Sequence, residues 1–276
     1  TQIQPILLYA SEIWALNSDT SIIERIHLFA MKRFLGVTAR TPNTMVYGEC
    51  GRFPLYVNAY VRCISYWLRL TRLPPERLPR KVYDMLVGLH EQNYTTWVHY
   101  IMITLYRHGF GVVWENQGAG HTKWFLKEFR TRLVDCFNQE WHSRLGSSER
   151  YSMYRLYKPS MCQSVFLSVL RHVQIRDLFI KFRLGISDLK CHKYRYRRDG
   201  NTSLKCPFCP HEETEVHFVF VCPKYCELRQ QHIPGKFYRR PSLFRFAAIM
   251  SDSNASVTRQ LAFYIYKAFA LRNGGM

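Results

Sequence analysis

Residues 206–222 read CPFCPHEETEVHFVFVC, in which three cysteines and one histidine follow the spacing C-x2-C-x7-H-x4-C. Two thiolates two residues apart can turn around one cation, and a histidine and a third cysteine can complete a tetrahedron from the segment that follows. Zinc favours these sulfur and imidazole donors, and four protein ligands leave no open position for a reacting molecule. The stretch therefore predicts a small structural zinc knuckle held by Cys206, Cys209, His217 and Cys222.

Two neighbouring residues leave the ligand set open, because His211 can replace His217 and Cys226 can replace Cys222. We favour His217 and Cys222, since apolar residues flank them and keep water from the metal. These flanking residues are Phe218 and Val221. The alternative without a metal is a set of reduced side chains that lie close together by chance.

The five-residue step from His217 to Cys222 is longer than one helical turn. A helix that carries His217 should therefore tighten or end near Cys222, and Pro223 suits such a boundary. We expect little β structure beyond a small hairpin at Cys206–Cys209.

The chain has 276 residues, enough to bury one large core or two smaller ones. Lys and Arg number 39 against 20 Asp and Glu, which gives a net charge of +19. Such an excess repels itself, and RNA or DNA is the usual partner that relieves it; mere solubility or an anionic membrane surface is the alternative. No run of about 18 apolar residues occurs, so we expect no membrane span.

The chain begins Thr1-Gln2-Ile3, without an initiator methionine or a secretory signal, so we interpret it as a fragment of a longer protein. Its nine cysteines are an odd number, and the Cys-x2-Cys pair is placed for metal, so a reducing compartment is expected. We therefore expect an intracellular protein of the nucleus or cytoplasm, not a secreted one.

Apolar residues recur at helical spacing along most of the chain and predict a mainly α fold. Ser21 and Glu24 have the spacing of a capping box at the start of one helix, and Pro54 can start a second helix that Pro74 ends. Three further stripes predict a long helix ending near residues 146–148, a helix that ends at Gly185, and a terminal helix. Their residues are Phe125, Phe129, Leu133, Phe137 and Trp141; Phe166, Val169, Leu170, Val173, Leu178, Phe179 and Phe182; and Val257, Leu261, Ile265, Ala268 and Phe269. The polar residues 146–148 suggest a boundary between a helical region 1–148 and a helical C-terminal region 149–276.

Several segments resemble the region just past the polymerase core of non-LTR (LINE-type) retrotransposon reverse transcriptases. They are LLYASEIW (7–14), MKRFLGV (31–37), PNTMVYGECGRFPLYV (42–57) and RCISYWLRL (62–70). In that family a thumb-like helical segment follows the palm, and a Cys-Cys-His-Cys knuckle comes near the C-terminus. The resemblance covers residues 6–75 and again 175–230, while the middle resembles the family only in being helical.

The catalytic part of that family has no counterpart in this sequence. The family's palm carries metal-binding aspartates in a Phe/Tyr-Ala-Asp-Asp-type motif for two-metal phosphoryl transfer. No Asp-Asp pair occurs here, so we carry over no catalytic residue and expect that this chain is not itself an enzyme. An independent nuclease would need clustered carboxylates, and we reject it because the acids are spread thinly, apart from Glu212, Glu213 and Glu215 beside the knuckle.

Just before the knuckle, residues 190–198 read KCHKYRYRR, with five cations, two tyrosines and no acid. Lys and Arg bind phosphates, and Tyr can stack on bases. A solvated loop without a ligand is the alternative. The segment predicts nucleic-acid contact through Lys190, Lys193, Tyr194, Arg195, Tyr196, Arg197 and Arg198.

We therefore expect a helical thumb-like and connector region followed by a helical region with a zinc knuckle. The resemblance implies a non-catalytic C-terminal portion of a LINE-type RNA-directed DNA polymerase, a transposable-element protein. It would position template RNA, target DNA or both, and a fragment of this kind would also contact the polymerase palm. The alternative is a zinc-stapled helical protein-interaction module that does not bind nucleic acid.

Overall fold

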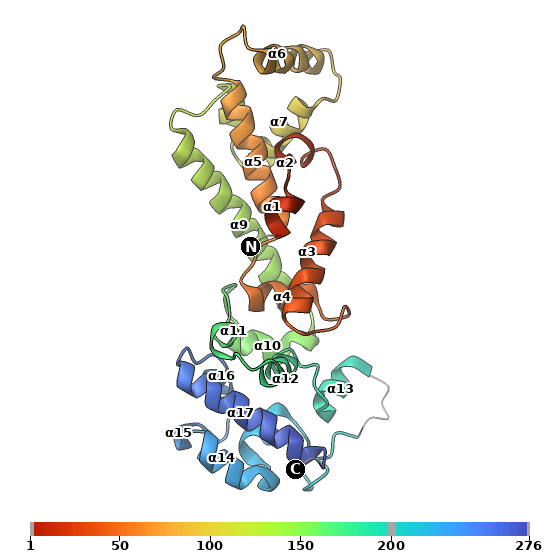
Figure 1. The fold of residues 1–276 in the computed structure, drawn as a ribbon, viewed down its shortest axis with the longest axis vertical. Helices are drawn as coiled ribbons and strands as arrows, with labels where there is room; N and C mark the ends of the chain where they lie inside the picture. The colour runs from red at the N-terminus through yellow and green to blue at the C-terminus, as the bar shows by residue number, and fades with distance from the viewer. Residues whose placement is uncertain (1–2, 198–202, 275–276) are drawn as a thin grey trace. The chain divides into compact units, whose positions relative to one another are not determined.

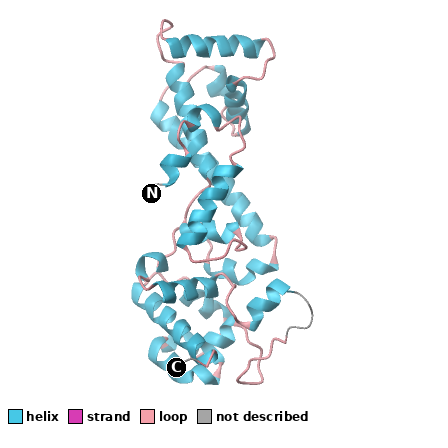
Figure 2. Cartoon of the chain, turned by 45° about the vertical axis from the view of Figure 1, so that its right-hand side comes forward, coloured by secondary structure: helices cyan, strands magenta, loops and turns pink. Residues whose placement is uncertain are grey.

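The computed structural model of this chain describes residues 3–197 and 203–274. These residues are mostly helical (Figures 1 and 2), and their β structure consists of isolated antiparallel bridges at Cys50–Gln163 and Lys205–Glu212. The predicted mainly α fold is confirmed. Within the described ranges, no helix has the length and apolar character needed to cross a membrane.

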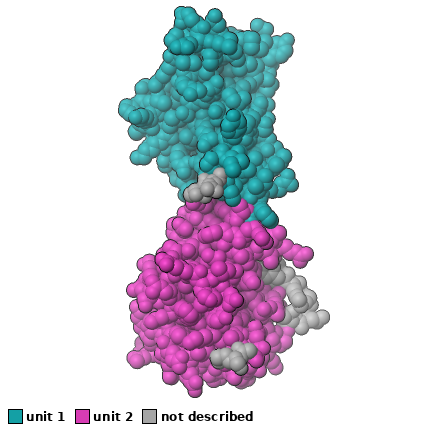
Figure 3. All heavy atoms as spheres, in the orientation of Figure 1, with its two compact units in different colours: residues 1–29, 53–141 teal, residues 30–52, 142–276 magenta. Residues whose placement is uncertain are grey.

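The chain forms two compact units, and neither is one continuous stretch (Figure 3). Unit 1 comprises residues 1–29 and 53–141, and unit 2 comprises residues 30–52 and 142–276. The predicted boundary at residue 148 lies near the last junction, and the units differ from the predicted regions in that residues 30–52 group with the C-terminal part. Residues 30–52 belong with the C-terminal part, because the helix they carry has its partners there.

Unit 1 is built around α5 (Leu55–Leu70), against which α2 (Ser11–Trp14), α6 (Leu78–Glu91) and α7 (Trp97–Arg107) pack. The helix that Pro54 was predicted to start is thus present, and its apolar residues Val57, Ile64, Trp67 and Leu68 are buried. The unit also contains α1 (Ile3–Leu7), the first part of α3 (Ser21–Phe34), α8 (Gly111–Glu115) and most of α9 (Thr122–Gly146).

The start of α3 differs from the predicted capping box. The Ser21 backbone N–H and hydroxyl both donate to the Asp19 carboxylate, at 2.8 and 2.6 Å, so Asp19 occupies the Ser21 side chain. The Glu24 carboxylate accepts a hydrogen bond from the Leu55 backbone N–H at 2.6 Å. It thereby satisfies a free donor at the start of α5, which sequence spacing within α3 could not reveal.

Two of the three long apolar stripes form the helices they predict. These are α9, which ends at Gly146, and α17 (Ala255–Arg272). The third stripe is broken into α11 (Phe166–Val169) and α12 (Val173–Arg183), because Leu170 and His172 have extended backbone. Val173 is consequently 55% exposed and not part of the core.

In unit 2, α17 packs against α11, α12, α14 (Cys226–His232) and α16 (Leu243–Met250). The remaining elements are short. They are α4 (Asn43–Cys50), η1 (Glu149–Tyr151), α10 (Ser152–Tyr157), α13 (Lys190–Arg197), the π-helical η2 (His217–Val221), η3 (Pro223–Tyr225) and α15 (Gly235–Tyr238).

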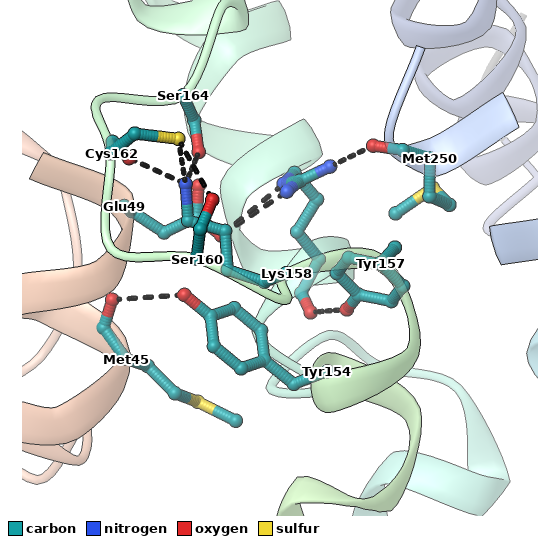
Figure 4. Close-up of polar contacts among 10 residues, drawn as sticks. Met45, Glu49, Tyr154, Tyr157, Lys158, Ser160, Cys162, Ser164 and Met250 are labelled. Atoms are coloured by element: carbon teal, nitrogen blue, oxygen red, sulfur yellow. Dashed lines mark hydrogen bonds and ion pairs between the residues drawn. The ribbon is translucent and has the colours of Figure 1, made fainter. Parts of the chain in front are cut away.

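A buried ion pair ties α4 to the rest of unit 2 (Figure 4). The Glu49 Oε1 atom of α4 lies 3.3 Å from Nη2 and 3.4 Å from Nε of Arg183 at the end of α12, and both side chains are at most 5% exposed. The guanidinium also donates to the Met250 carbonyl at 2.5 Å and lies over the Tyr157 ring, 4.9 Å from its centroid. One arginine thus joins α4, α10, α12 and α16.

The chain leaves α4 through Gly51, which has a φ of +58°. A Cβ atom at this position would lie 2.2 Å from the Gln163 backbone nitrogen, so only glycine fits. The Ser164 N–H donates to the Glu49 carbonyl at 3.0 Å beside this contact. Residues 162–164 therefore lie directly on the end of α4, which explains why residues 30–52 join unit 2.

Candidate metal centre and basic helix

The first two candidate ligands lie in a small hairpin, as the sequence predicted. Lys205 and Glu212 form an antiparallel bridge, the Cys206 N–H donates to the His211 carbonyl at 2.7 Å, and the Glu213 N–H donates to the Leu204 carbonyl at 2.7 Å. The segment between these bonds turns at Cys206–Cys209 and brings both thiols to one side of the unit.

The other two candidate ligands are brought into line by a π-helical turn. The Cys222 N–H donates to the His217 carbonyl at 2.8 Å, an i→i+5 bond, and η2 ends there. The helix ends near Cys222, as predicted. Its last turn is a π turn, which is wider than an α-helical turn, whereas the sequence prediction expected a tighter turn or an end at this point. A π turn places residues five apart on one face, and such turns occur frequently at functional sites. The spacing H-x4-C therefore matches the local backbone.

Four donor atoms converge as a result. The Sγ atoms of Cys206 and Cys222 are 3.9 Å apart, the Cys209 Sγ is 3.2 Å from the His217 Nε2, and all four donor atoms lie within 4.8 Å of one another. Zinc bonds of about 2.3 Å to sulfur and about 2.05 Å to nitrogen give tetrahedral edges of about 3.8 Å and about 3.6 Å. The donor set and its dimensions therefore suit a tetrahedral metal ion.

The surroundings support this choice of ligands, although not every predicted neighbour contributes. Phe218 is fully buried, with its ring centroid 5.0 Å from that of Tyr225, whereas Val221 is 40% exposed and forms no wall. His211 stacks on His217 with a ring-centroid distance of 5.7 Å, and Cys226 is exposed. Neither His211 nor Cys226 belongs to the cluster of four donors.

Burial sets the protonation state of the candidate ligands. Burial raises the pKa of Cys222 to about 12, with the neighbouring Cys206 sulfur adding to the effect, and burial also raises the pKa of Cys206. Burial lowers the pKa of His217, so its imidazole is neutral at pH 7, the form that binds metal. Buried thiolates need a positive charge, and a divalent ion supplies it.

Two glutamates between the hairpin and η2 hold the basic helix α13. Glu213 accepts a hydrogen bond from the Lys190 backbone N–H at 2.8 Å, and it also pairs with Arg272 of α17 at 2.8 and 3.0 Å. Glu215 accepts from the Nε2 of His192 at 3.0 Å and pairs with both Nη atoms of Arg195. The metal cluster and α13 are therefore joined through adjacent residues of one segment.

Glu215 is ionised in this arrangement. Burial opposes its charge, but the hydrogen bonds and charges of His192 and Arg195 outweigh burial and hold the pKa of its carboxyl far below the usual range. The other ring nitrogen of His192, Nδ1, lies 2.7 Å from the Ser187 hydroxyl and 3.3 Å from the Ser187 backbone nitrogen. Sequence reasoning missed His192 and Ser187, because a histidine inside a basic run carries no signal of burial.

The predicted nucleic-acid residues have different environments. Lys193 is 45% and Tyr194 is 41% exposed, and both can reach a ligand. Arg195 is only 22% exposed and is held by Glu215, so the structure gives it a partner within the protein. Lys190 starts the helix, Tyr196 and Arg197 end it, and Arg198 lies outside the described residues.

No protein-family model, no curated protein and no solved structure matches this chain. Inferences about its function therefore rest on its own residues.

Proposed function

We propose that this chain is the non-catalytic, nucleic-acid-binding C-terminal portion of a LINE-type RNA-directed DNA polymerase, stapled by one structural zinc ion. The observation that carries the proposal is the link between the metal cluster and α13 through Glu213 and Glu215. Zinc would be held by Cys206, Cys209, His217 and Cys222, and it would supply a fixed charge and four bonds that hold the hairpin against η2. The basic helix would then be presented on a rigid support.

The charges around the knuckle support binding in place of catalysis. The side chains of Glu213 and Glu215 are at most 5% exposed and already bonded to Arg272 and Arg195, so they are not poised to hold a catalytic metal ion. The whole chain carries a net charge of +19, and Lys193 and Tyr194 are exposed on α13. In this role the chain positions template RNA, target DNA or both, and it contacts the polymerase palm.

The test is a fluorescence-anisotropy titration of single-stranded RNA and DNA at several salt concentrations. Each phosphate contact contributes about −0.7 to the log–log salt slope on single strands, so a Lys190→Ala, Lys193→Ala double variant should flatten the slope by about 1.4. Tyr194→Ala should weaken binding by about 1–3 kcal/mol per stacked base and leave the slope unchanged. Lys181→Ala, which removes an exposed cation from α12, is the matched control.

An unchanged slope in the double variant would show that α13 does not contact the nucleic acid. Loss of binding in the Lys181 control to the same extent would show that only overall charge matters. Zinc content and the far-UV circular dichroism spectrum must stay at wild-type values, so that the comparison reports binding and not folding.

One observation favours the protein-interaction module as a second candidate. Three residues on one face of α3 are exposed although apolar: Ile22 (56%), Ile26 (48%) and Phe29 (64%). The buried residues of this helix lie on another face and include Leu28 and Met31. An exposed apolar stripe of this kind suits a protein surface. If this candidate holds alone, the chain binds zinc but shows no salt-dependent affinity for RNA or DNA.

A further inference from the structure

A pocket of about 270 Å³ opens beside α13 in unit 2, and none of the four candidate zinc ligands lines it. Its wall combines the turn before α4 with the turn before α13. The lining residues are Thr38, Arg40, Thr41, Ile186, Ser187, Asp188, His192 and Lys193. The pocket falls just below the range of about 300–1,000 Å³ typical of small-molecule sites, so it can hold a phosphate with part of the group attached to it.

The inner wall of the pocket is polar and buried. Thr41 is 3%, Ser187 is 8% and His192 is 1% exposed. The Thr41 hydroxyl has no hydrogen-bond partner among the described residues, which is uncommon for a buried polar atom. His192 is fixed between Ser187 and Glu215, so its ring cannot turn away. The inner wall therefore offers the Thr41 hydroxyl beside a fixed Ser187–His192 pair.

The exposed wall of the pocket carries two cations. Arg40 is exposed and lies in a turn that two hydrogen bonds hold in place. The Thr41 N–H donates to the Thr38 carbonyl at 3.1 Å, and the Lys32 ammonium donates to the Ala39 carbonyl at 2.8 Å. Lys193 lies on the other side, 3.2 Å from Asp188. That carboxylate is 69% exposed, so an anion of higher charge can take its place beside Lys193.

We propose that this pocket binds the terminal phosphate of a nucleic-acid strand. This proposal rests on the proposed nucleic-acid function and assigns a second contact to the same surface. Arg40 and Lys193 provide the charge that a phosphate monoester requires, and the hydroxyls of Thr38 and Thr41 provide donors, while the Ser187 hydroxyl stays bonded to His192. A strand end suits this pair of cations better than an internal phosphate, because a terminal phosphate monoester carries a charge of about −1.5 to −2 at pH 7.

The experiment compares a ten-nucleotide strand that carries a 5′-phosphate, a 3′-phosphate or hydroxyl ends, using anisotropy with the full chain. We expect a phosphorylated end to bind several-fold more tightly than the hydroxyl strand. Arg40→Ala and Lys193→Ala should each remove roughly tenfold of affinity for the phosphorylated strand, because a charge-assisted hydrogen bond is lost. Asp188→Asn should act in the opposite direction and raise that affinity by up to about fivefold, since an exposed competing carboxylate is removed.

Matched controls remove exposed cations outside the pocket: Arg33→Ala in α3 and Lys181→Ala in α12. All three pocket positions are solvent-exposed, so these variants should fold as the wild type does, which circular dichroism checks. Calorimetry with inorganic phosphate gives a readout that does not depend on the rest of the strand, and the same variants should rank in the same order.

If strands bind with a steep salt dependence but a terminal phosphate adds nothing, the pocket proposal is overturned while the nucleic-acid function stands. Equal losses in the control variants and in Arg40→Ala would overturn it as well. If inorganic phosphate binds but no strand does, both proposals are overturned.

Discussion

Replacing Glu49 by glutamine tests how unit 2 is held together. The Glu49→Gln variant keeps the size of the side chain and an acceptor oxygen but removes the charge. The Arg183 guanidinium would then stay buried with neutral partners alone: the amide oxygen, the Met250 carbonyl and the faces of aromatic rings. Removing one partner of a buried ion pair destabilises a protein by about 3–5 kcal/mol, because the other charge is left uncompensated. The cation–π contacts of Arg183 with the Tyr157 and Phe166 rings remain in the variant and offset part of this loss of stability, by about 2 kcal/mol at most. We therefore expect a loss of about 2–4 kcal/mol in unit 2.

The tryptophans make this measurement specific to one unit. All six lie in unit 1: Trp14, Trp67, Trp97, Trp114, Trp124 and Trp141. Tryptophan fluorescence therefore follows unit 1, while far-UV circular dichroism follows both units. In urea, where the free energy changes by about 1–3 kcal/mol per M, Glu49→Gln should lower the dichroism midpoint of unit 2 by about 1–3 M. The fluorescence midpoint should change less.

A double variant, Glu49→Leu with Arg183→Met, completes the experiment. Apolar replacement of both partners is often neutral or stabilising, because no charge remains buried. The double variant should therefore unfold at higher urea than Glu49→Gln. A double variant that is no more stable than Glu49→Gln, or a dichroism midpoint that does not change in Glu49→Gln, would falsify the assignment of α4 to unit 2 through this ion pair.

Two further predictions concern the metal centre. Metal analysis should show that zinc and the local fold of the knuckle are lost in Cys206→Ser and Cys222→Ser. Zinc should be retained in Cys226→Ser and His211→Ala, which lie outside the ligand set. Equal loss of zinc in Cys226→Ser would show that the ligand set is wrong. Zinc affinity should also rise with pH, because the Cys206 and Cys222 thiols have raised pKa values and each must lose a proton to bind. Above pH 7 the neutral His217 adds nothing, whereas each of the three cysteine ligands releases a proton when it binds. Competition with a chelator should therefore give a slope of about two to three log units per pH unit, and stability from zinc should be lost as the pH falls. A flat profile between pH 7 and 8 would contradict thiolate ligation.

The sequence predicts those features that depend on local spacing. The stripes of α9 and α17 recur at helical spacing, and each forms a helix that turns this face toward the core. The Cys-x2-Cys hairpin is likewise local, because one turn defines both thiol positions. Local rules also locate the end of α9 at Gly146.

Features that depend on distant partners could not be predicted in this way. Arg195 reads as a free cation in a basic run, yet Glu215, 20 residues later, binds it. Glu24 reads as part of a capping box, yet Leu55 uses its carboxylate. The interruption after Val169 also escapes periodicity, because Leu170 and Val173 keep the helical spacing although Leu170 and His172 have extended backbone. In each case the tertiary partner, and not the local pattern, decides the role of the residue.

The position of α4 in unit 2 has a consequence for how the protein is made. Glu49 leaves the ribosome 134 residues before Arg183, which at about 5–20 residues per second is a delay of roughly 7 to 27 s. During that interval α4 has been synthesised without the arginine that its carboxylate binds, while all of residues 53–141 emerge. A recombinant fragment that begins at residue 142 would be in the reverse situation, with Arg183 present and Glu49 missing. Expression of the C-terminal half therefore requires residues 30–52 as well, supplied either in the full chain or as a separate peptide.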